Sequence, residues 1–212
     1  MIGVFGVLAN GGDPVSGMKV IAAPLLLGCG VASVLATALA VRIWASALAR
    51  DRTPDGLGLF LPRWPVLIAG GVMGAAIAGG YIALAVLAGP EPPNPEESFM
   101  AQAVARGGLA KLSWAVFALV FAPLYEEVLF RGLMWKGISA SWGKLPAAVL
   151  VTAVFTGLHY SEVKNYWPAA VCIGLLAVAA LGARVRTGSL ATAIAVHFTY
   201  NAVIVATAYL QS

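Results

Sequence analysis

The chain has 212 residues, of which 60% are hydrophobic and only 10% are charged, and its formal net charge is +4. Soluble domains carry about 25% charged residues, so the composition argues against an ordinary soluble domain and indicates a membrane protein. The basic residues cluster at the ends of apolar segments and form no basic stripe with interleaved aromatic side chains, so we expect no nucleic-acid partner.

The residues up to Gly17 have no basic region before their apolar stretch, so we expect no cleaved signal peptide and an ordered or re-entrant lead-in. Six apolar segments follow, and roughly 20 apolar residues span a bilayer. The pattern predicts an all-α, polytopic integral membrane helix bundle of about six transmembrane helices, in a single domain over residues 1–212. The segments are Val20–Ala49, Trp64–Ala88, Gly108–Ile138, Pro146–Tyr160, Pro168–Ala183 and Ser189–Leu210.

The charges of the loops predict an orientation. Basic residues follow the odd-numbered segments, whereas acidic residues gather after the second segment, in the loop Gly89–Ser98. By the positive-inside rule both termini lie outside. The alanine- and glycine-rich composition is typical of a prokaryotic plasma-membrane protein. The basic residues are Arg50, Arg52, Arg63, Lys136, Lys144, Arg184 and Arg186.

Small residues within the apolar segments predict packing rather than chemistry. Gly70 and Gly74 have GxxxG spacing within Ala69–Gly80, and such residues let two helices approach closely. Cys29 and Cys172 lie far apart in apolar segments, so they predict small buried residues and neither a disulfide nor a metal site.

The third segment carries three charges in the stretch FAPLYEEVLFRGLMW. A charge at the bilayer centre costs at least ~2.5 kcal/mol. Glu127 and Arg131 are four residues apart, so they share a helix face and are expected to pair. Glu126 is rotated about 100° from Glu127 and needs a partner elsewhere. Pro123, just ahead of the glutamates, predicts a kink.

Both histidines of the chain, His159 and His197, are embedded in apolar sequence. The midpoint between positions 126 and 159 falls in the expected turn Ser139–Lys144, so in an antiparallel hairpin Glu126 and His159 lie at nearly equal height. His197 is expected about 15 Å from its own turn, against roughly 22 Å for the other two, so tilted helices bring the three together. Asn201 shares a helix face with His197.

Two kinds of chemistry fit this set of residues. Glu126 and His159 together can hold and deprotonate a water molecule, while His197 and Asn201 can donate hydrogen bonds to a developing oxyanion. Alternatively, Glu126, His159 and His197 can bind zinc and leave a position open for water. Phe155, four residues before His159, is expected to pack beside the pocket. Either arrangement suits peptide hydrolysis inside a membrane.

Three motifs occur in order on separate apolar segments: EEVLFR matches EExxxR, FTGLH matches FxxxH, and HFTYN matches HxxxN. In these motifs the chain resembles the CPBP family of intramembrane proteases. That family includes the type II CAAX prenyl endopeptidases and many bacterial bacteriocin-processing or immunity proteins. The resemblance covers about residues 112–210, the expected catalytic core.

The resemblance implies a role for each motif residue. Glu126 would act with His159 on the attacking water, and Glu127 with Arg131 would orient the site. The histidine and asparagine of HxxxN would stabilise the oxyanion. Members are described both as metalloproteases and as metal-free, glutamate-dependent enzymes, so the resemblance leaves zinc open as a cofactor.

The sequence thus favours an intramembrane endopeptidase that acts on a membrane-associated protein or peptide. An alternative is a non-catalytic membrane scaffold or bacteriocin-immunity protein, although such a protein could lose Glu126 or His159 and this chain keeps both. A transporter or proton relay would spread its polar residues along a path, whereas here they are expected at one depth.

Overall fold

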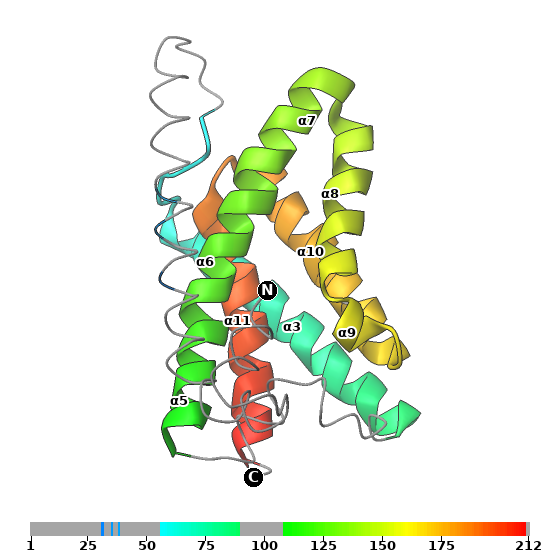
Figure 1. Ribbon diagram of the computed structural model, residues 1–212. Helices are drawn as coiled ribbons and strands as arrows, with labels where there is room; N and C mark the ends of the chain where they lie inside the picture. Colours follow the sequence, from blue (N-terminus) through cyan, green and yellow to red (C-terminus); the bar gives the residue numbers. More distant parts are fainter. Residues whose placement is uncertain (1–30, 32–34, 36–37, 39–55, 90–107, 211–212) are drawn as a thin grey trace, which may run out of the picture.

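A computed structural model describes residues 56–89 and 108–210, together with the single positions 31, 35 and 38. Every regular element in these residues is a helix (Figure 1), which confirms the all-α prediction. The first predicted segment and the N-terminal lead-in fall largely outside the described residues. Four helices are long and apolar enough to cross a membrane, and the chain is an integral membrane protein. They are Trp64–Ala88, Lys111–Trp142, Trp167–Thr187 and Leu190–Leu210, with a shorter apolar helix at Lys144–Leu158.

Helices α3 (Trp64–Ala88) and α11 (Leu190–Leu210) cross and pack against each other (Figure 1). The bounds of α3 are those predicted from its apolar run, and it ends before Gly89, whose φ of 83° favours glycine. Gly70 and Gly74 are buried in the face of α3 that meets α11. The predicted packing role of the GxxxG spacing is therefore confirmed.

The third span is one continuous helix in which two π-helical stretches flank the turn that carries the glutamates. It continues to Trp142, so the predicted turn Ser139–Lys144 narrows to Gly143, whose φ of 86° permits a sharp reversal. In order, the elements are α5 (Gly108–Val116), η1 (Phe117–Phe121), α6 (Ala122–Glu127), η2 (Val128–Met134) and α7 (Trp135–Trp142).

The predicted fifth segment, Pro168–Ala183, is longer in the structure because its terminal charge is satisfied. Arg184 donates hydrogen bonds to the carbonyls of Gly188 and Gly56, at 2.7 and 3.1 Å, so the helix continues past its apolar core. The fourth segment ends earlier, and His159 forms the junction to a further short helix. These elements are α8 (Lys144–Leu158), α9 (Tyr160–Val163) and α10 (Trp167–Thr187).

The packing of these helices brings three distant parts of the chain together. The hairpin of α7 and α8 places the C-terminal end of α8 opposite the end of α6, and α11 packs against α6 (Figure 1). Buried apolar side chains from η2, α8 and α10 fill the space behind them. The end of α8, the end of α6 and the middle of α11 therefore meet.

Candidate active site

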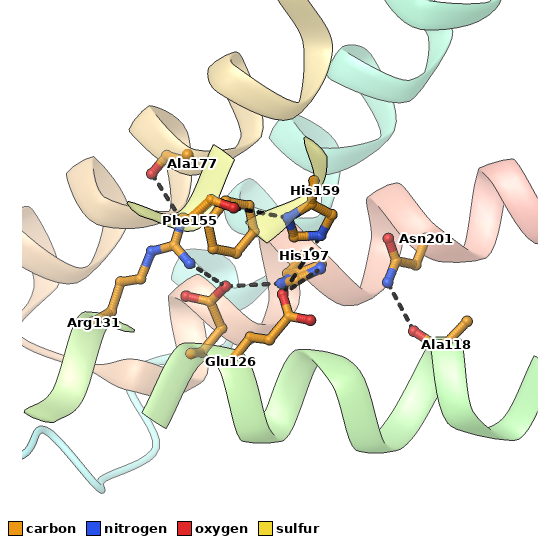
Figure 2. A network of polar contacts seen from close by, with 9 residues as sticks. Ala118, Glu126, Arg131, Phe155, His159, Ala177, His197 and Asn201 are labelled. Carbon is orange, nitrogen blue, oxygen red and sulfur yellow. Dashed lines mark hydrogen bonds and ion pairs between the residues drawn. The ribbon is translucent and has the colours of Figure 1, made fainter. Parts of the chain in front are cut away.

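The polar side chains singled out from the sequence come together from four parts of the fold (Figure 2). Their burial is graded: Glu127 and Arg131 are fully buried, whereas the side chains of Glu126 and His159 are 20% and 27% exposed. The site therefore has a closed side and an open side. Glu126 and Glu127 come from α6, Arg131 from η2, His159 from the junction of α8 and α9, and His197 and Asn201 from α11.

The predicted pair of Glu127 and Arg131 forms at the closed side. Arg131 Nη1 donates to Glu127 Oε1 at 3.0 Å, and its Nη2 donates to the backbone carbonyl of Ala177 at 3.0 Å (Figure 2). Removing one member of a buried pair leaves the other charge uncompensated, at a cost of several kcal/mol. Arg131 therefore balances the charge of Glu127 and also links the third span to α10.

Glu127 also contacts His197 on α11. His197 Nδ1 lies 2.8 Å from the same Oε1 atom that accepts from Arg131. A carboxylate in this ion pair accepts hydrogen bonds, so the Nδ1 atom of His197 carries a proton. The contact thereby fixes the ring and points Nε2 toward Glu126, at 4.0 Å from its Oε2 atom.

His159 is oriented in the same way by a different acceptor. Its Nδ1 atom donates to the backbone carbonyl of Phe155 at 2.8 Å, because a carbonyl oxygen can only accept (Figure 2). Its Nε2 atom then lies 4.0 Å from Glu126 Oε2. Two imidazoles from different helices thus turn the same ring atom toward one carboxylate oxygen.

The ring of Phe155 fills the space between these groups. It is fully buried, and its centroid lies 4.7 Å from the ring of His159 and 5.9 Å from that of His197. The Arg131 guanidinium carbon lies 4.3 Å from the same centroid, within the range of a cation–π interaction. The sequence placed Phe155 beside the pocket, and the structure places it in contact with three of the polar residues.

Glu126 differs from Glu127, whose Oε1 atom accepts two hydrogen bonds although its Oε2 atom also has no partner within the described residues. Its Oε2 atom is buried and has no hydrogen-bond partner within the described residues. The nearest polar groups are the two imidazole Nε2 atoms, both at 4.0 Å. These separations are too long for a direct hydrogen bond but suit one bridging molecule.

Asn201 is held by a carbonyl that the helix leaves free. The backbone N–H of Ala122 donates to Phe117, five residues back, in the π-helical stretch η1. The next residue, Pro123, has no N–H to donate. The carbonyl of Ala118 accepts from Asn201 Nδ2 instead, at 2.7 Å (Figure 2). The second N–H of this amide remains for another acceptor.

The positions of Glu126, His159 and His197 bear on the alternative zinc site. Tetrahedral zinc with bonds of about 2.0–2.1 Å holds its ligand atoms about 3.3 Å apart. Here Glu126 Oε2 lies 4.0 Å from each imidazole Nε2 atom. No group of three His, Cys, Asp or Glu side chains in the described part of the chain is arranged to hold a metal ion. At these separations the side chains do not fit a tetrahedral zinc ion.

Comparison with protein families decides the relationship. The model of the type II CAAX prenyl endopeptidase Rce1-like family matches residues 108–203. Residues 108–203 of this chain are therefore similar to the Rce1-like family. The predicted family resemblance is confirmed, whereas the bacteriocin-processing branch remains a prediction. No curated protein and no solved structure matches the chain.

The Rce1-like segment contains all six polar residues of the site, but α3 lies outside it. Sequence reasoning missed the backbone carbonyls of Ala118 and Ala177, which hold Asn201 and Arg131. No side-chain pattern signals a carbonyl, because every residue has one. Pro123 was a usable signal, since a proline leaves an acceptor without its N–H donor.

Proposed function

We propose that this protein is an intramembrane endopeptidase that hydrolyses a peptide bond of a membrane-associated protein or peptide. One observation carries the proposal: Glu126 Oε2 has no direct donor and lies 4.0 Å from the Nε2 atoms of both His159 and His197. The Rce1-like match supports it independently. The proposed catalytic core is residues 112–210, within a single membrane domain.

The attacking water is proposed to bind between Glu126 and His159. Two hydrogen bonds of about 2.8 Å span a 4.0 Å gap when they meet at roughly 90°, which is close to the angle between the two O–H bonds of water. Glu126 and His159 both accept a hydrogen bond from the same water molecule, because the Nδ1 proton of His159 leaves its Nε2 atom as an acceptor. Water held in this way is activated as a nucleophile.

The charge on Glu127 supports a protonated His197. A neutral His197 with its proton on Nδ1 has only a lone pair on Nε2 and donates nothing there. An imidazolium donates from both nitrogens, and a buried carboxylate at Nδ1 stabilises it. We therefore assign the oxyanion-binding role to the imidazolium form, together with the free N–H of Asn201.

The proposed reaction conserves its atoms and protons. The water oxygen bonds to the scissile carbonyl carbon while one water proton passes to Glu126. The tetrahedral oxyanion accepts hydrogen bonds from His197 and Asn201. The carbon–nitrogen bond then breaks, and Glu126 returns its proton to the leaving amine.

The proposed setting follows from the loop charges and composition. We place the protein in a prokaryotic plasma membrane with both termini outside, in contact with lipid and with a membrane-associated peptide substrate. No nucleic-acid partner is proposed.

The test compares the N- and C-termini of membrane proteins in cells that carry the wild type, a deletion, or Glu126→Gln. A matched control is Glu162→Gln, the same change at an exposed carboxylate on α9. All variants are quantified in the membrane fraction. We expect fragments with the wild type and the control that disappear with Glu126→Gln. A deletion phenotype that Glu126→Gln rescues fully, without any change in fragments, would refute catalysis and leave the scaffold or immunity alternative.

A further inference from the structure

Helix α3 lies outside the Rce1-like segment, yet it packs along the helix that carries His197. The face that makes this contact contains Gly70 and Gly74, and two further glycines, Gly79 and Gly80, lie farther along α3. These four of the five glycines of α3 differ in what surrounds them, so α3 contains its own internal controls.

At Gly74 the backbone of α11 occupies the place of a side chain. A Cβ atom there would lie 2.0 Å from the carbonyl oxygen of Val196, 2.9 Å from its carbonyl carbon and 3.1 Å from the N atom of Tyr200. Real Cβ atoms essentially never show separations under 3.0 Å. All three contacted atoms are backbone, so no side-chain rotation relieves the clash.

The contacted turn is the one that carries the site. Val196 directly precedes His197, and Tyr200 directly precedes Asn201. A Cβ at Gly74 would need the Val196 carbonyl to retreat from 2.0 Å to at least 3.0 Å, a shift of about 1 Å. A shift of that size is enough to break the 2.8 Å hydrogen bond between His197 and Glu127.

From this contact we propose that Gly74 is a positioning residue for His197. Its missing Cβ lets α3 touch the backbone of α11, and this contact sets where the imidazole enters the site. A residue outside the Rce1-like segment thereby controls the geometry inside it. The consequence for activity rests on the proposed function, whereas the consequence for the His197 ring does not.

The experiment observes the imidazole ring of His197 directly by NMR, which is feasible because the chain has only two histidines. Protein labelled with ¹⁵N-histidine is purified in detergent with a tag that contains no histidine, and His159→Gln assigns the two sets of imidazole signals. Gly74→Ala is compared with Gly79→Ala, where nothing lies within 4 Å of an added Cβ. Both changes improve helix propensity equally, so propensity cannot account for a difference.

We expect Gly74→Ala to shift the His197 signals and Gly79→Ala to leave them unchanged. With a cleavable substrate, kcat is expected to fall roughly ten- to a hundredfold with little change in KM, because misplacement by 1 Å affects the reacting geometry. A mere loss of packing stability predicts neither a selective shift of His197 nor a change confined to kcat.

The outcomes separate the two proposals. A folded Gly74→Ala protein with unchanged His197 signals overturns the positioning role, whatever its activity. A shifted ring in a protein whose wild type cleaves nothing supports the positioning role and refutes the proposed function.

If Gly74→Ala does not accumulate, Gly70→Ala replaces it, with an added carbon 3.0 Å from the carbonyl oxygen of Thr192, one turn away. A smaller shift of the His197 signals is expected there, and no shift overturns the proposal.

Discussion

Glu126 and Glu127 are neighbours on α6, and their surroundings are opposite. Glu127 is fully buried and accepts hydrogen bonds from Arg131 and His197, whereas Glu126 is partly exposed and has no direct donor to its Oε2 atom within the described residues. A carboxylate that accepts two charged hydrogen bonds at one oxygen, as Glu127 does at Oε1, is held in one place. Glu126 Oε2 instead lies 4.0 Å from the Nε2 atoms of both histidines, and we propose that it exchanges a proton with a bridging water molecule. The comparison separates a structural role from a chemical one.

The largest loss of stability is expected when the positive charge of Arg131, which pairs with Glu127, is removed. Arg131→Met removes the guanidinium partner of a fully buried carboxylate and is expected to cost about 3–5 kcal/mol of unfolding free energy. Denaturant unfolding in detergent measures the loss. Arg186→Met is the matched control, because Arg186 is exposed and its loss is expected to stay within about 0.5 kcal/mol.

Removing both charges of the pair sharpens this prediction. The double variant Glu127→Leu with Arg131→Met leaves no unpaired charge between the two positions, so it is expected to be more stable than Arg131→Met alone. A double variant less stable than the single would contradict the assignment of Arg131 to Glu127.

An isosteric pair of substitutions compares the two glutamates themselves. Glu127→Gln weakens two charged hydrogen bonds and is expected to lower stability by about 1–3 kcal/mol. Glu126→Gln is expected to change stability by less than about 0.5 kcal/mol while hydrolysis falls by roughly 10²–10⁴-fold. Unfolding and cleavage are measured on the same preparations. Equal losses of stability in the two variants would remove the distinction.

The smallest expected effect concerns the anchor of Asn201. Pro123→Ala supplies a backbone N–H that competes for the Ala118 carbonyl, so Asn201 is held less firmly. We expect kcat to fall about three- to tenfold, less than the 10²–10³ lost with a whole oxyanion donor. Pro168→Ala is the control, since a proline in the first turn of α10 replaces an N–H that has no helical acceptor. An equal fall in both variants would exclude a specific role for Pro123.

Helix bounds and contacts between residues one turn apart could be predicted from the sequence, because both depend on local periodicity. The apolar run predicted α3 with its observed bounds, and the i,i+4 spacing predicted the pair of Glu127 and Arg131. Both follow from the fixed geometry of a helix, in which side chains four residues apart share a face. The three motifs likewise predicted the resemblance to the Rce1-like family over residues 108–203.

The hydrogen bonds between different helices could be identified only from the three-dimensional packing. His197 donates to Glu127 across 70 residues, and the carbonyls of Ala118 and Ala177 hold Asn201 and Arg131. Hydropathy also did not predict the short turn at Gly143 or the extension of α10 past its apolar core. Distances between helices depend on how closely their backbones pack, and at Gly74 the backbone of α11 occupies the place that a Cβ would need.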